Sequence, residues 1–226
     1  MNYSLILLCA GSGKRTGLKY NKIFYKINNQ TVYEMNISHF LEDNRCKQII
    51  VVTKENEIDD IRTLVNDSRI EYVFGGKERQ DSVYEGLQKV KENHVFIHDG
   101  ARPFVDESII ERTYQAVKEY RACVAGMPSK DTVKIVDEND FAVNTPERRF
   151  VWCIQTPQVF ETALIRHAYF KLMENEENET GITDDAMVVE RMENCAVKLV
   201  EGSYENIKIT TPEDLILAES LIKKRN

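Results

Sequence analysis

The chain has 226 residues, 42% of them hydrophobic, and its 30 basic and 37 acidic side chains give a formal net charge of −7. This balance disfavours a general nucleic-acid binder, which needs a broad basic face, but a local cluster of arginine and lysine can still hold a small anionic ligand. The longest apolar run, from Leu5 to Ala10, is too short to span a bilayer and has no charged segment before it. We therefore expect neither a membrane segment nor a signal peptide.

The cysteines indicate a cytoplasmic protein, and the histidines give no sign of a metal site. The five cysteines are scattered and never form a CxxC pair, which is typical of reduced thiols rather than of a disulfide framework. The four histidines have no ligand spacing with one another or with a cysteine. We therefore expect no metal site built from these side chains.

Short β-branched runs alternate with helical patterns along the chain. The runs predict strands over residues 3–9, 48–53, 70–74, 95–98, 123–127 and 197–200. Between them, apolar side chains at helical spacing predict helices around residues 32–41, 58–65, 83–90 and 109–117. The alternation predicts parallel strands joined by crossover helices, which together make an α/β sandwich.

The C-terminal stretch TTPEDLILAESLIKK predicts a final helix. Thr211 is a suitable N-cap and Pro212 a suitable first helical residue. Acidic residues follow in the first turn and lysines stand at the end, as the helix dipole favours.

The alternation breaks from Lys130 to about Trp152. Two short alternating stretches flank a polar turn region there, which predicts a β-hairpin arm inserted at about residues 130–152. A two-stranded hairpin is marginally stable alone and needs a surface to pack against. A second subunit would supply that surface, and an edge hairpin lying on its own domain fits the pattern equally well.

The loop CAGSGKR follows the first predicted strand. A P-loop would need glycine at position 8 and serine or threonine at position 15, where the chain has Leu8 and Arg15, and the glycine spacing is not that of a dinucleotide fingerprint. Glycines nevertheless let backbone N–H groups approach an anion, and Lys14, Arg15 and Lys22 add donors. The loop is either a phosphate site or a plain tight turn with surface cations.

Two further stretches place polar residues after predicted strands. GGKERQDSV offers Arg79 and Ser82 just before a helix, where an ordinary turn capped by Asp81 is the alternative. HDGARPF offers Asp99 and Arg102, where a structural ion pair is the alternative. Ligands of open parallel sheets sit beyond the carboxyl ends of the strands, so these residues would face the same crevice as the first loop.

Lys208 lies between two isoleucines near the C-terminus. On a strand, it would point away from the core that Ile207 and Ile209 fill. It would then reach either a ligand or water.

With these stretches in hand, the chain resembles the 2-C-methyl-D-erythritol 4-phosphate cytidylyltransferases of non-mevalonate isoprenoid synthesis. The resemblance rests on eight motifs that occur in the family's order and cover essentially the whole chain: CAGSGKR, NKIF, GGKERQDSV, HDGARPFV, DTVK, QTPQVF, TDDA and EGSYENIKITTPEDL. One departure is Cys9, which stands where the family usually has the first of two alanines; because cysteine is small and apolar, we expect little effect.

The resemblance implies a fold, a reaction and an assembly. The fold would be a single Rossmann-like three-layer sandwich over residues 1–226, with a protruding β-arm that embraces a second subunit in a homodimer. The reaction would be attack of the methylerythritol phosphate on the α-phosphorus of CTP, with diphosphate leaving and Mg²⁺ held mainly by phosphate oxygens. The attacking phosphate is already largely ionised near neutral pH, with a second pKa of about 6, so no general base is needed. Catalysis would then consist of positioning and charge stabilisation.

Residue by residue, the matching motifs imply these roles. The CTP site would be formed by Ala10, Gly11, Gly13, Gly76, Ser82 and Asp99, with Gly76 and Ser82 reading the cytosine and Arg79 supporting their loop. The triphosphate and the transition state would be stabilised by Arg15, Lys22 and Lys208. The second substrate would contact Asp99 and Arg102 and, from the arm of the other subunit, Thr132 and Arg148. The resemblance favours Arg148 over Arg149 because Arg148 stands four residues before Trp152, as in the family, and on a strand the two arginines would point to opposite faces. Together, Arg15, Lys22, Arg102 and Lys208 would be four cations converging in one crevice.

Three alternatives remain beside this interpretation. An alditol-phosphate cytidylyltransferase, acting on ribitol 5-phosphate for example, would share the fold and the mechanism. A non-catalytic nucleotide-binding module would be expected to lack one or more of the phosphate cations, yet Arg15, Lys22 and Lys208 are all present. A sugar transferase of similar fold would usually have a DxD-type metal pair, where this chain has the single acid of HDG.

Overall fold

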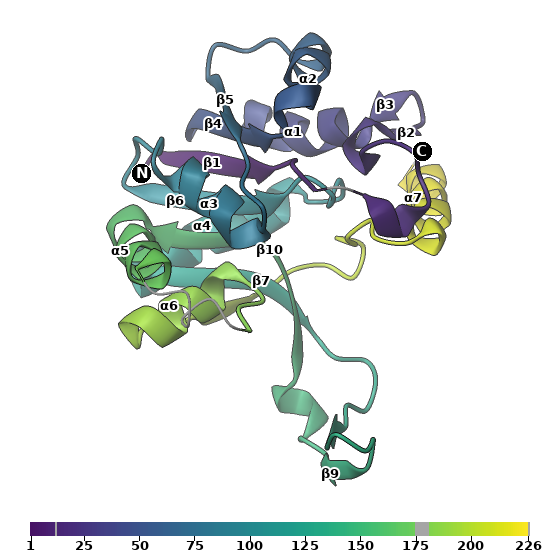
Figure 1. Ribbon diagram of the computed structural model, residues 1–226, viewed down its shortest axis with the longest axis vertical. Helices are drawn as coiled ribbons and strands as arrows, with labels where there is room; N and C mark the ends of the chain where they lie inside the picture. The colour runs from purple at the N-terminus through teal and green to yellow at the C-terminus, as the bar shows by residue number, and fades with distance from the viewer. Residues whose placement is uncertain (12, 175–180, 226) are drawn as a thin grey trace.

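The computed structural model describes residues 1–11, 13–174 and 181–225 (Figure 1). Within these ranges, one large sheet contains β1 (Tyr3–Leu8), β4 (Cys46–Thr53), β5 (Ile70–Phe74), β6 (His94–Asp99), β7 (Ala122–Pro128), β10 (Trp152–Glu161) and β11 (Lys198–Glu201). Their spatial order is β11, β7, β10, β6, β1, β4 and β5. The helices are α1 (Val32–Glu42), α2 (Ile58–Leu64), α3 (Arg79–Leu87), α4 (Glu107–Tyr120), α5 (Thr162–Met173), α6 (Asp185–Glu193) and α7 (Pro212–Arg225).

Helices cover both faces of this sheet, so the protein has three layers. Successive side chains of a strand point to opposite faces, and β1 shows the consequence. Leu5 and Leu7 pack in a core with residues of α1, α2 and α4, whereas Ile6 packs in a second core with residues of α3, α5 and α6. Helix α7 closes a third, smaller cluster with β2 (Lys26–Ile27) and α1, beside β3 (Gln30–Thr31).

The predicted α/β sandwich of parallel strands is confirmed, but the sheet contains one further strand, β10, that lies outside the predicted pattern. Strand β10 lies between β6 and β7 and runs antiparallel to both. Its sequence, WCIQTPQVFE, contains Pro157, and proline disfavours the interior of a strand. The chain leaves β7 into the arm and returns from it directly into β10, as the two strands of a long hairpin do, so β10 runs antiparallel to β7.

The predicted helices are present, and two further helices extend the pattern. Helix α7 begins at Pro212 as expected, and the carboxylate of Asp214 accepts a hydrogen bond from the N–H of Thr211 at 2.8 Å. Helices α5 and α6 follow one another between β10 and β11 and interrupt the alternation of strands and helices. None of the described helices combines the length and the apolar composition that a bilayer span requires.

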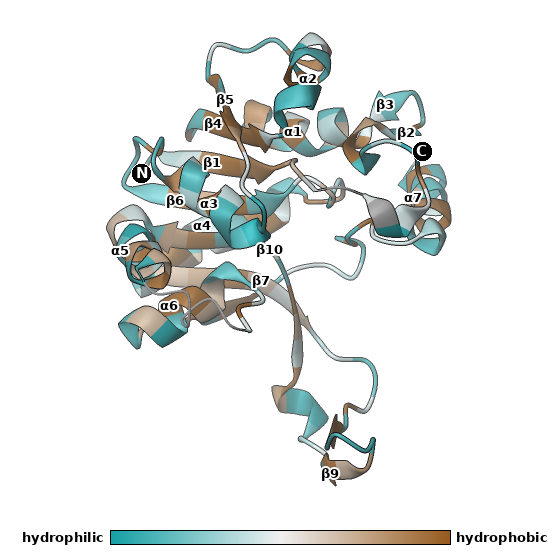
Figure 2. Ribbon diagram, in the orientation of Figure 1, coloured by the Kyte–Doolittle hydropathy of each residue, from teal (hydrophilic) through white to brown (hydrophobic). Residues whose placement is uncertain are grey.

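The predicted arm protrudes from the body of the protein (Figure 1). It carries β8 (Ile135–Val136) and β9 (Ala142–Asn144), which pair antiparallel. Apolar side chains on it are exposed, among them Phe141 and Phe150, each with 72% of its surface accessible, and Figure 2 shows hydrophobic colour at β9. The arm therefore presents apolar surface that this chain alone does not cover.

Candidate active site

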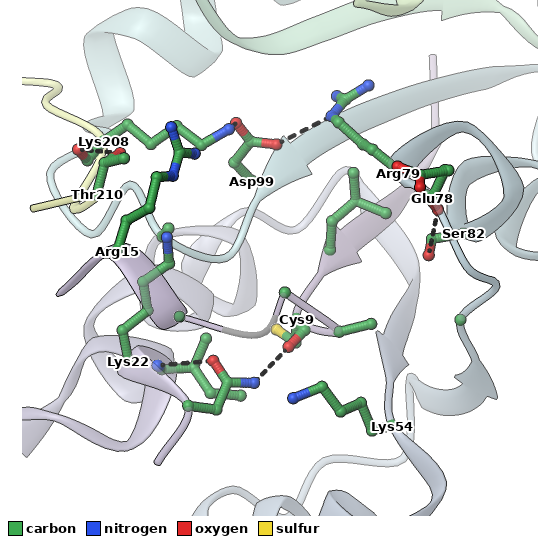
Figure 3. A pocket seen from close by; sticks show the side chains of 18 of the residues that line it. Cys9, Arg15, Lys22, Lys54, Glu78, Arg79, Ser82, Asp99, Lys208 and Thr210 are labelled. Carbon is green, nitrogen blue, oxygen red and sulfur yellow. Dashed lines mark hydrogen bonds and ion pairs between the residues drawn. The ribbon is translucent and has the colours of Figure 1, made fainter. Parts of the chain in front are cut away.

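A cavity of about 550 Å³ opens beyond the carboxyl ends of β1, β4, β5 and β6 (Figure 3). This volume falls within the range of about 300–1,000 Å³ that is usual for ligand sites. Its walls come from the loop after β1, the residue after β4, the glycine turn after β5, the end of β6 and the segment before α7. In open α/β sheets, ligands bind at this edge.

The loop after β1 turns sharply at Gly13 and presents Arg15 to the cavity. Gly13 has a φ of +65°, a left-handed conformation that favours glycine, and a Cβ there would lie 3.3 Å from the backbone nitrogen of Lys22. Buried Thr16 secures the turn because its hydroxyl donates to the carbonyl of Gly13 at 2.6 Å. Arg15, in the 3₁₀ turn Lys14–Thr16, is exposed and lines the cavity.

A second short turn, Lys22–Phe24, carries Lys22 and is anchored by buried Asn21. The side-chain amide of Asn21 donates to the carbonyl of Cys9 at 2.8 Å and to the carboxylate of Glu57 at 2.7 Å. The carbonyl oxygen of the same side chain accepts from the N–H of Ile23, so it caps the turn. The Asn–Lys pair is therefore a structural unit in which Asn21 holds Lys22 at the cavity wall.

The turn after β5 brings backbone close to the cavity. A Cβ on Gly76 would lie 2.2 Å from the Cβ of Asp81, so no larger residue fits there. The expectation that Asp81 caps the helix needs correction: Glu78 is the N-cap residue, and Asp81 lies in the first turn of α3, where its carboxylate accepts from the N–H of Glu78 at 2.9 Å. Ser82 is buried and donates to the carbonyl of Glu78 at 3.2 Å, with its side chain in the cavity lining.

Asp99, at the end of β6, is surrounded by cations. Its carboxylate lies 2.7 Å from the ammonium of Lys208, 3.4 Å from the guanidinium of Arg79 and 3.7 Å from that of Arg102. Burial by itself would raise the pKa of Asp99, but the three cations outweigh it and hold that pKa well below its usual range. Asp99 is therefore ionised and forms the anionic centre of the site.

Arg79 links this centre to α6. Its guanidinium donates to both oxygens of Asp185, at 2.9 and 2.7 Å, and Asp185 also accepts from the hydroxyl of Tyr169 at 2.6 Å. The side chain of Asp185 is fully buried. Arg79 thus joins α3, α6 and the tip of β6, while part of it still lines the cavity.

Lys22 lies in a cationic environment. Burial lowers its pKa to about 8, and the nearby charges of Lys208 and Arg15 act in the same direction. Figure 3 shows these three side chains pointing into the same region of the cavity. Cations held this close together repel one another, so the arrangement suits a polyanionic ligand that would neutralise them.

The structure places most of the predicted site residues in this one cavity. Those that line it are Ala10, Gly11, Gly13, Arg15, Lys22, Gly76, Ser82, Asp99 and Lys208. They come from segments separated by up to two hundred residues of chain, so their meeting is a property of the fold. Their individual roles stay predictions.

Arg102, Thr132 and Arg148 do not line the cavity. Arg102 lies behind it, where its guanidinium donates to the carbonyl of Asn206 at 2.8 Å and pairs with Asp99. Only three of the four cations expected to converge there, Arg15, Lys22 and Lys208, therefore reach it. Thr132 and Arg148 lie on the exposed arm, where Arg148 donates to the carbonyl of Lys130.

Two local expectations need correction. The segment around Lys208 is irregular rather than a strand, although Ile209 is buried and Lys208 turns to the cavity, as the alternation predicted. Residues Arg148–Phe150 form a 3₁₀ turn, and the strand begins only at Trp152. Strand geometry therefore does not separate the directions of Arg148 and Arg149.

Several lining residues were not predicted, chiefly Lys54, Lys77 and Thr210. Lys54 directly follows β4, so the rule that ligands lie beyond strand ends would have found it. Its ammonium pairs with Glu57 at 2.9 Å. Thr210 carried no comparable signal.

Acids are sparse in the site. The lining includes Glu78 and Asp99, and Asp99 is already paired with Lys208. Within residues 1–11, 13–174 and 181–225 there is no group of three or more histidine, cysteine or acidic side chains arranged to hold a metal ion. Most charged side chains of the lining are therefore cationic, which suits a phosphate-bearing ligand.

Comparison with known proteins agrees with this geometry. A family model described as 2-C-methyl-D-erythritol 4-phosphate cytidylyltransferase matches residues 3–224. Two proteins of that name, from Lachnospira eligens and Clostridioides difficile, are 43% and 45% identical over 96% and 97% of this chain, and the matches cover 98% and 93% of those proteins. The crystal structure of 4-diphosphocytidyl-2C-methyl-D-erythritolsynthase from Anaerococcus prevotii is similar, with a TM-score of 0.88 and 35% identity over 97% of this chain and 95% of that one. The chain therefore belongs to the 2-C-methyl-D-erythritol 4-phosphate cytidylyltransferase family.

Proposed function

We propose that the protein transfers a cytidylyl group from CTP to 2-C-methyl-D-erythritol 4-phosphate and releases diphosphate. The observation that carries this proposal is the convergence of Arg15, Lys22 and Lys208 on one cavity of an acidic protein. Two anions must meet in the reaction, and negative charge builds on the transferring and leaving oxygens. Cations and backbone N–H groups are the chemical tools for that task.

In the proposed mechanism, the substrate phosphate is its own nucleophile. Its oxygen attacks the α-phosphorus, the bond to the β-phosphate oxygen breaks, and diphosphate leaves with the electron pair. Arg15 and Lys22 hold the triphosphate and balance the leaving charge, and Lys208 reaches the phosphates while it stays paired with Asp99. Asp99 then keeps Lys208 oriented and receives a hydroxyl of the ribose or of the second substrate.

Nucleotide recognition is assigned to backbone and to one hydroxyl. Ala10, Gly11 and Gly13 would pass along the nucleotide, while the Gly76 turn and Ser82 would meet the edge of the cytosine. Because a side chain at Gly76 would collide with Asp81, the backbone itself is presented to the base.

We assign Mg²⁺ to the nucleotide rather than to a protein cage. Magnesium is usually bound through one or two carboxylates together with substrate phosphates. In the cavity lining, Asp99 is the carboxylate that lies among the proposed phosphate-binding cations, so it is the side chain that would contact the ion. Bound to phosphate oxygens, the ion would neutralise part of the triphosphate charge.

We assign the arm to a homodimer contact. Its exposed apolar side chains, Phe141 and Phe150 above all, would be covered by a second copy of the chain. Thr132 and Arg148 would then reach the methylerythritol phosphate in the partner's cavity.

The whole chain would act as one catalytic domain, and its cysteines, all free thiols, suit the reducing cytoplasm.

A diphosphate-release assay tests the proposed function. The protein is incubated with CTP and Mg²⁺ and with either 2-C-methyl-D-erythritol 4-phosphate or ribitol 5-phosphate. Release with the first substrate alone is expected, and replacing CTP by ATP, GTP or UTP should abolish it. Preference for ribitol 5-phosphate would move the protein to the alditol-phosphate alternative, and release with neither substrate would refute both.

The pKa of Lys22 predicts a pH dependence. Because this pKa is lowered to about 8, Lys22 in the free enzyme loses its charge as the pH rises through that value. We expect kcat/KM for CTP to fall over the same interval, since this parameter reports the free enzyme. In Lys22→Arg the side chain stays charged, so the fall should move to higher pH. A profile that is flat between about pH 7 and 9 in the wild type would contradict the assignment.

The arm assignment predicts an asymmetric effect of Arg148→Ala. A hydrogen bond to a charged group is worth about 1.5–3 kcal/mol, so we expect KM for methylerythritol phosphate to rise at least about tenfold. KM for CTP should change little. Arg149→Ala is the matched control, because Arg149 is exposed and pairs with Glu147. Equal rises for both substrates, or the same effect from the control, would count against the assignment.

A further inference from the structure

Two sequence motifs whose roles are only partly explained, HDGARPF and QTPQVF, meet behind the cavity. His98 is fully buried, and buried Thr156 lies beside it on β10. The hydroxyl oxygen of Thr156 is 3.0 Å from Nδ1 of His98 and 3.1 Å from the backbone nitrogen of Asp99. Nε2 of His98 lies 3.2 Å from the carbonyl oxygen of Arg102. The two side chains thus touch both ends of the turn that carries Asp99.

These distances determine where each proton lies. The N–H of Asp99 donates to the hydroxyl oxygen of Thr156, which leaves the hydroxyl proton to be donated to Nδ1 of His98. Nε2 then carries the ring proton and donates to the carbonyl of Arg102. The opposite tautomer would place two acceptors against each other at Arg102. Burial lowers the pKa of His98 to about 4, so the ring is neutral near pH 7.

Thr156 also reaches the chain segment that carries Lys208. Its carbonyl accepts from the side-chain amide of Asn206 at 2.9 Å, and Asn206 in turn accepts from Arg102 at 2.8 Å. Asn206 is fully buried and precedes Lys208 by two residues. Thr156 is therefore bonded through its side chain to the Asp99 turn and through its backbone to the Lys208 segment. The ion pair between Asp99 and Lys208, 2.7 Å long, spans the gap between these two segments.

We propose that Thr156 and His98 are positioning residues that set the geometry of the Asp99–Lys208 pair at the cavity wall. Neither lines the cavity, so both act through the residues they hold. The proposal concerns hydrogen bonds within this chain, and only its kinetic consequence rests on the proposed function. A misplacement of a reacting group by about 1 Å can cost on the order of 100-fold in rate, so a small shift of this pair is sufficient to matter.

The kinetic test compares Thr156→Val with Thr156→Ser. Valine keeps the volume but removes the hydroxyl, which leaves the N–H of Asp99 without an acceptor and Nδ1 of His98 without a donor. We expect kcat to fall about 10- to 100-fold, with KM for CTP changing less than about threefold. Serine restores the hydroxyl and should keep most of the activity. A general loosening of the protein would instead raise both KM values and would not be rescued by serine.

Thr113→Val is the matched control. Thr113 is also fully buried, but its hydroxyl donates only to carbonyls of its own helix, those of Ile109 and Ile110. It does not line the cavity. We expect the control to alter stability without altering kcat. If Thr156→Val and Thr113→Val have the same kcat, or if Thr156→Ser is as slow as Thr156→Val, the proposal is overturned.

Two measurements test the geometry without activity. Nitrogen-15 NMR of the wild type should show His98 as the neutral tautomer protonated at Nε2, and a proton at Nδ1 would overturn the proposal. A crystal structure of Thr156→Val should show the Asp99–Lys208 distance lengthened beyond the ion-pair limit of about 4 Å. An unchanged pair would also overturn it.

If the wild type released no diphosphate, the proposed function would fail while both of these readouts would still decide the positioning role. If Thr156→Val did not fold, the NMR spectrum of the wild type and the kinetics of Thr156→Ser would decide it.

Discussion

Replacing Lys22 by alanine is expected to lower kcat about 100- to 1,000-fold while the protein stays folded. The ammonium of Lys22 is half-buried among the charges of Lys208 and Arg15, so in the proposed role it would act on phosphate oxygens with little screening by water. Arg15→Ala should have a comparable effect on kcat, since Arg15 lines the same wall. Steady-state kinetics with saturating CTP and methylerythritol phosphate measure both losses.

The stability of Lys22→Ala should move in the opposite direction from its activity. The pKa of Lys22 is lower in the folded protein than in the unfolded chain, because burial and the neighbouring cations disfavour its charge. Removing the charge relieves this repulsion, so the nucleotide-free variant should be as stable as the wild type or more stable. Because the pKa of Lys22 is lower in the folded protein, the destabilisation caused by its charge decreases as the pH rises from about 8 towards about 10.4, the pKa of lysine in an unfolded chain.

Lys224→Ala is the matched control for both measurements. Lys224 lies on α7, and its side chain is 76% exposed and pairs with Glu205 at 3.3 Å. It has no part in the role assigned to Lys22. Exposed pairs of this kind contribute about 0–1 kcal/mol, so neither kcat nor stability should change measurably. Near-normal turnover in both Lys22→Ala and Arg15→Ala would contradict the proposed role of these two cations in stabilising the transition state.

Replacing Asp185 by alanine is expected to lower the free energy of unfolding by about 3 kcal/mol. Asp185 is fully buried, and its removal leaves Arg79 without its bidentate partner and the hydroxyl of Tyr169 without an acceptor. Breaking a buried ion pair typically costs about 3–5 kcal/mol, and we expect the lower end because the side chain of Arg79 is 29% exposed to water. Chemical denaturation followed by circular dichroism measures the change.

An exposed ion pair supplies the comparison for Asp185. The carboxylate of Glu147 and the guanidinium of Arg149 lie 2.7 Å apart, yet the two side chains are 66% and 72% exposed. Glu147→Gln should therefore change the free energy of unfolding by less than about 1 kcal/mol. If Asp185→Ala were no more destabilising than Glu147→Gln, the hydrogen bonds of Asp185 to Arg79 and Tyr169, which join α3, α5 and α6, would not contribute to stability.

Local patterns predicted the parallel half of the fold well. Strand β5 has the predicted bounds, and β1, β4 and β6 differ from their predicted ranges by two residues or fewer at each end. These strands are short β-branched runs bounded by helical patterns, which is the signal that periodicity detects best. The spacing signal of α5 was also present in the sequence, since its buried side chains recur at helical intervals. This helix is not among the predicted ones, so the predicted alternation of strands and helices is stricter than the observed one.

Local sequence patterns cannot predict the direction of β10. A strand that returns from an arm between two parallel neighbours takes its direction from its pairing partners, which lie 61 to 65 residues away for Ile97 and Val95. The same limit applies to Arg102. Its position after β6 indicated the cavity, but the carbonyl of Asn206, 104 residues along the chain, draws its guanidinium behind the wall.

Residue types and their order establish the chemistry that is available: the glycines that admit an anion, the cations Arg15, Lys22 and Lys208, and the acid Asp99 at the end of a strand. Residue types and short-range spacing encode these features, because backbone freedom, charge and periodicity are local properties. The packing of distant segments sets which of these groups face one cavity, which cations surround Asp99, and that His98 and Thr156 meet behind it. Those outcomes depend on contacts between segments far apart in the chain, where burial removes water and makes each charge and hydrogen bond depend on its neighbours.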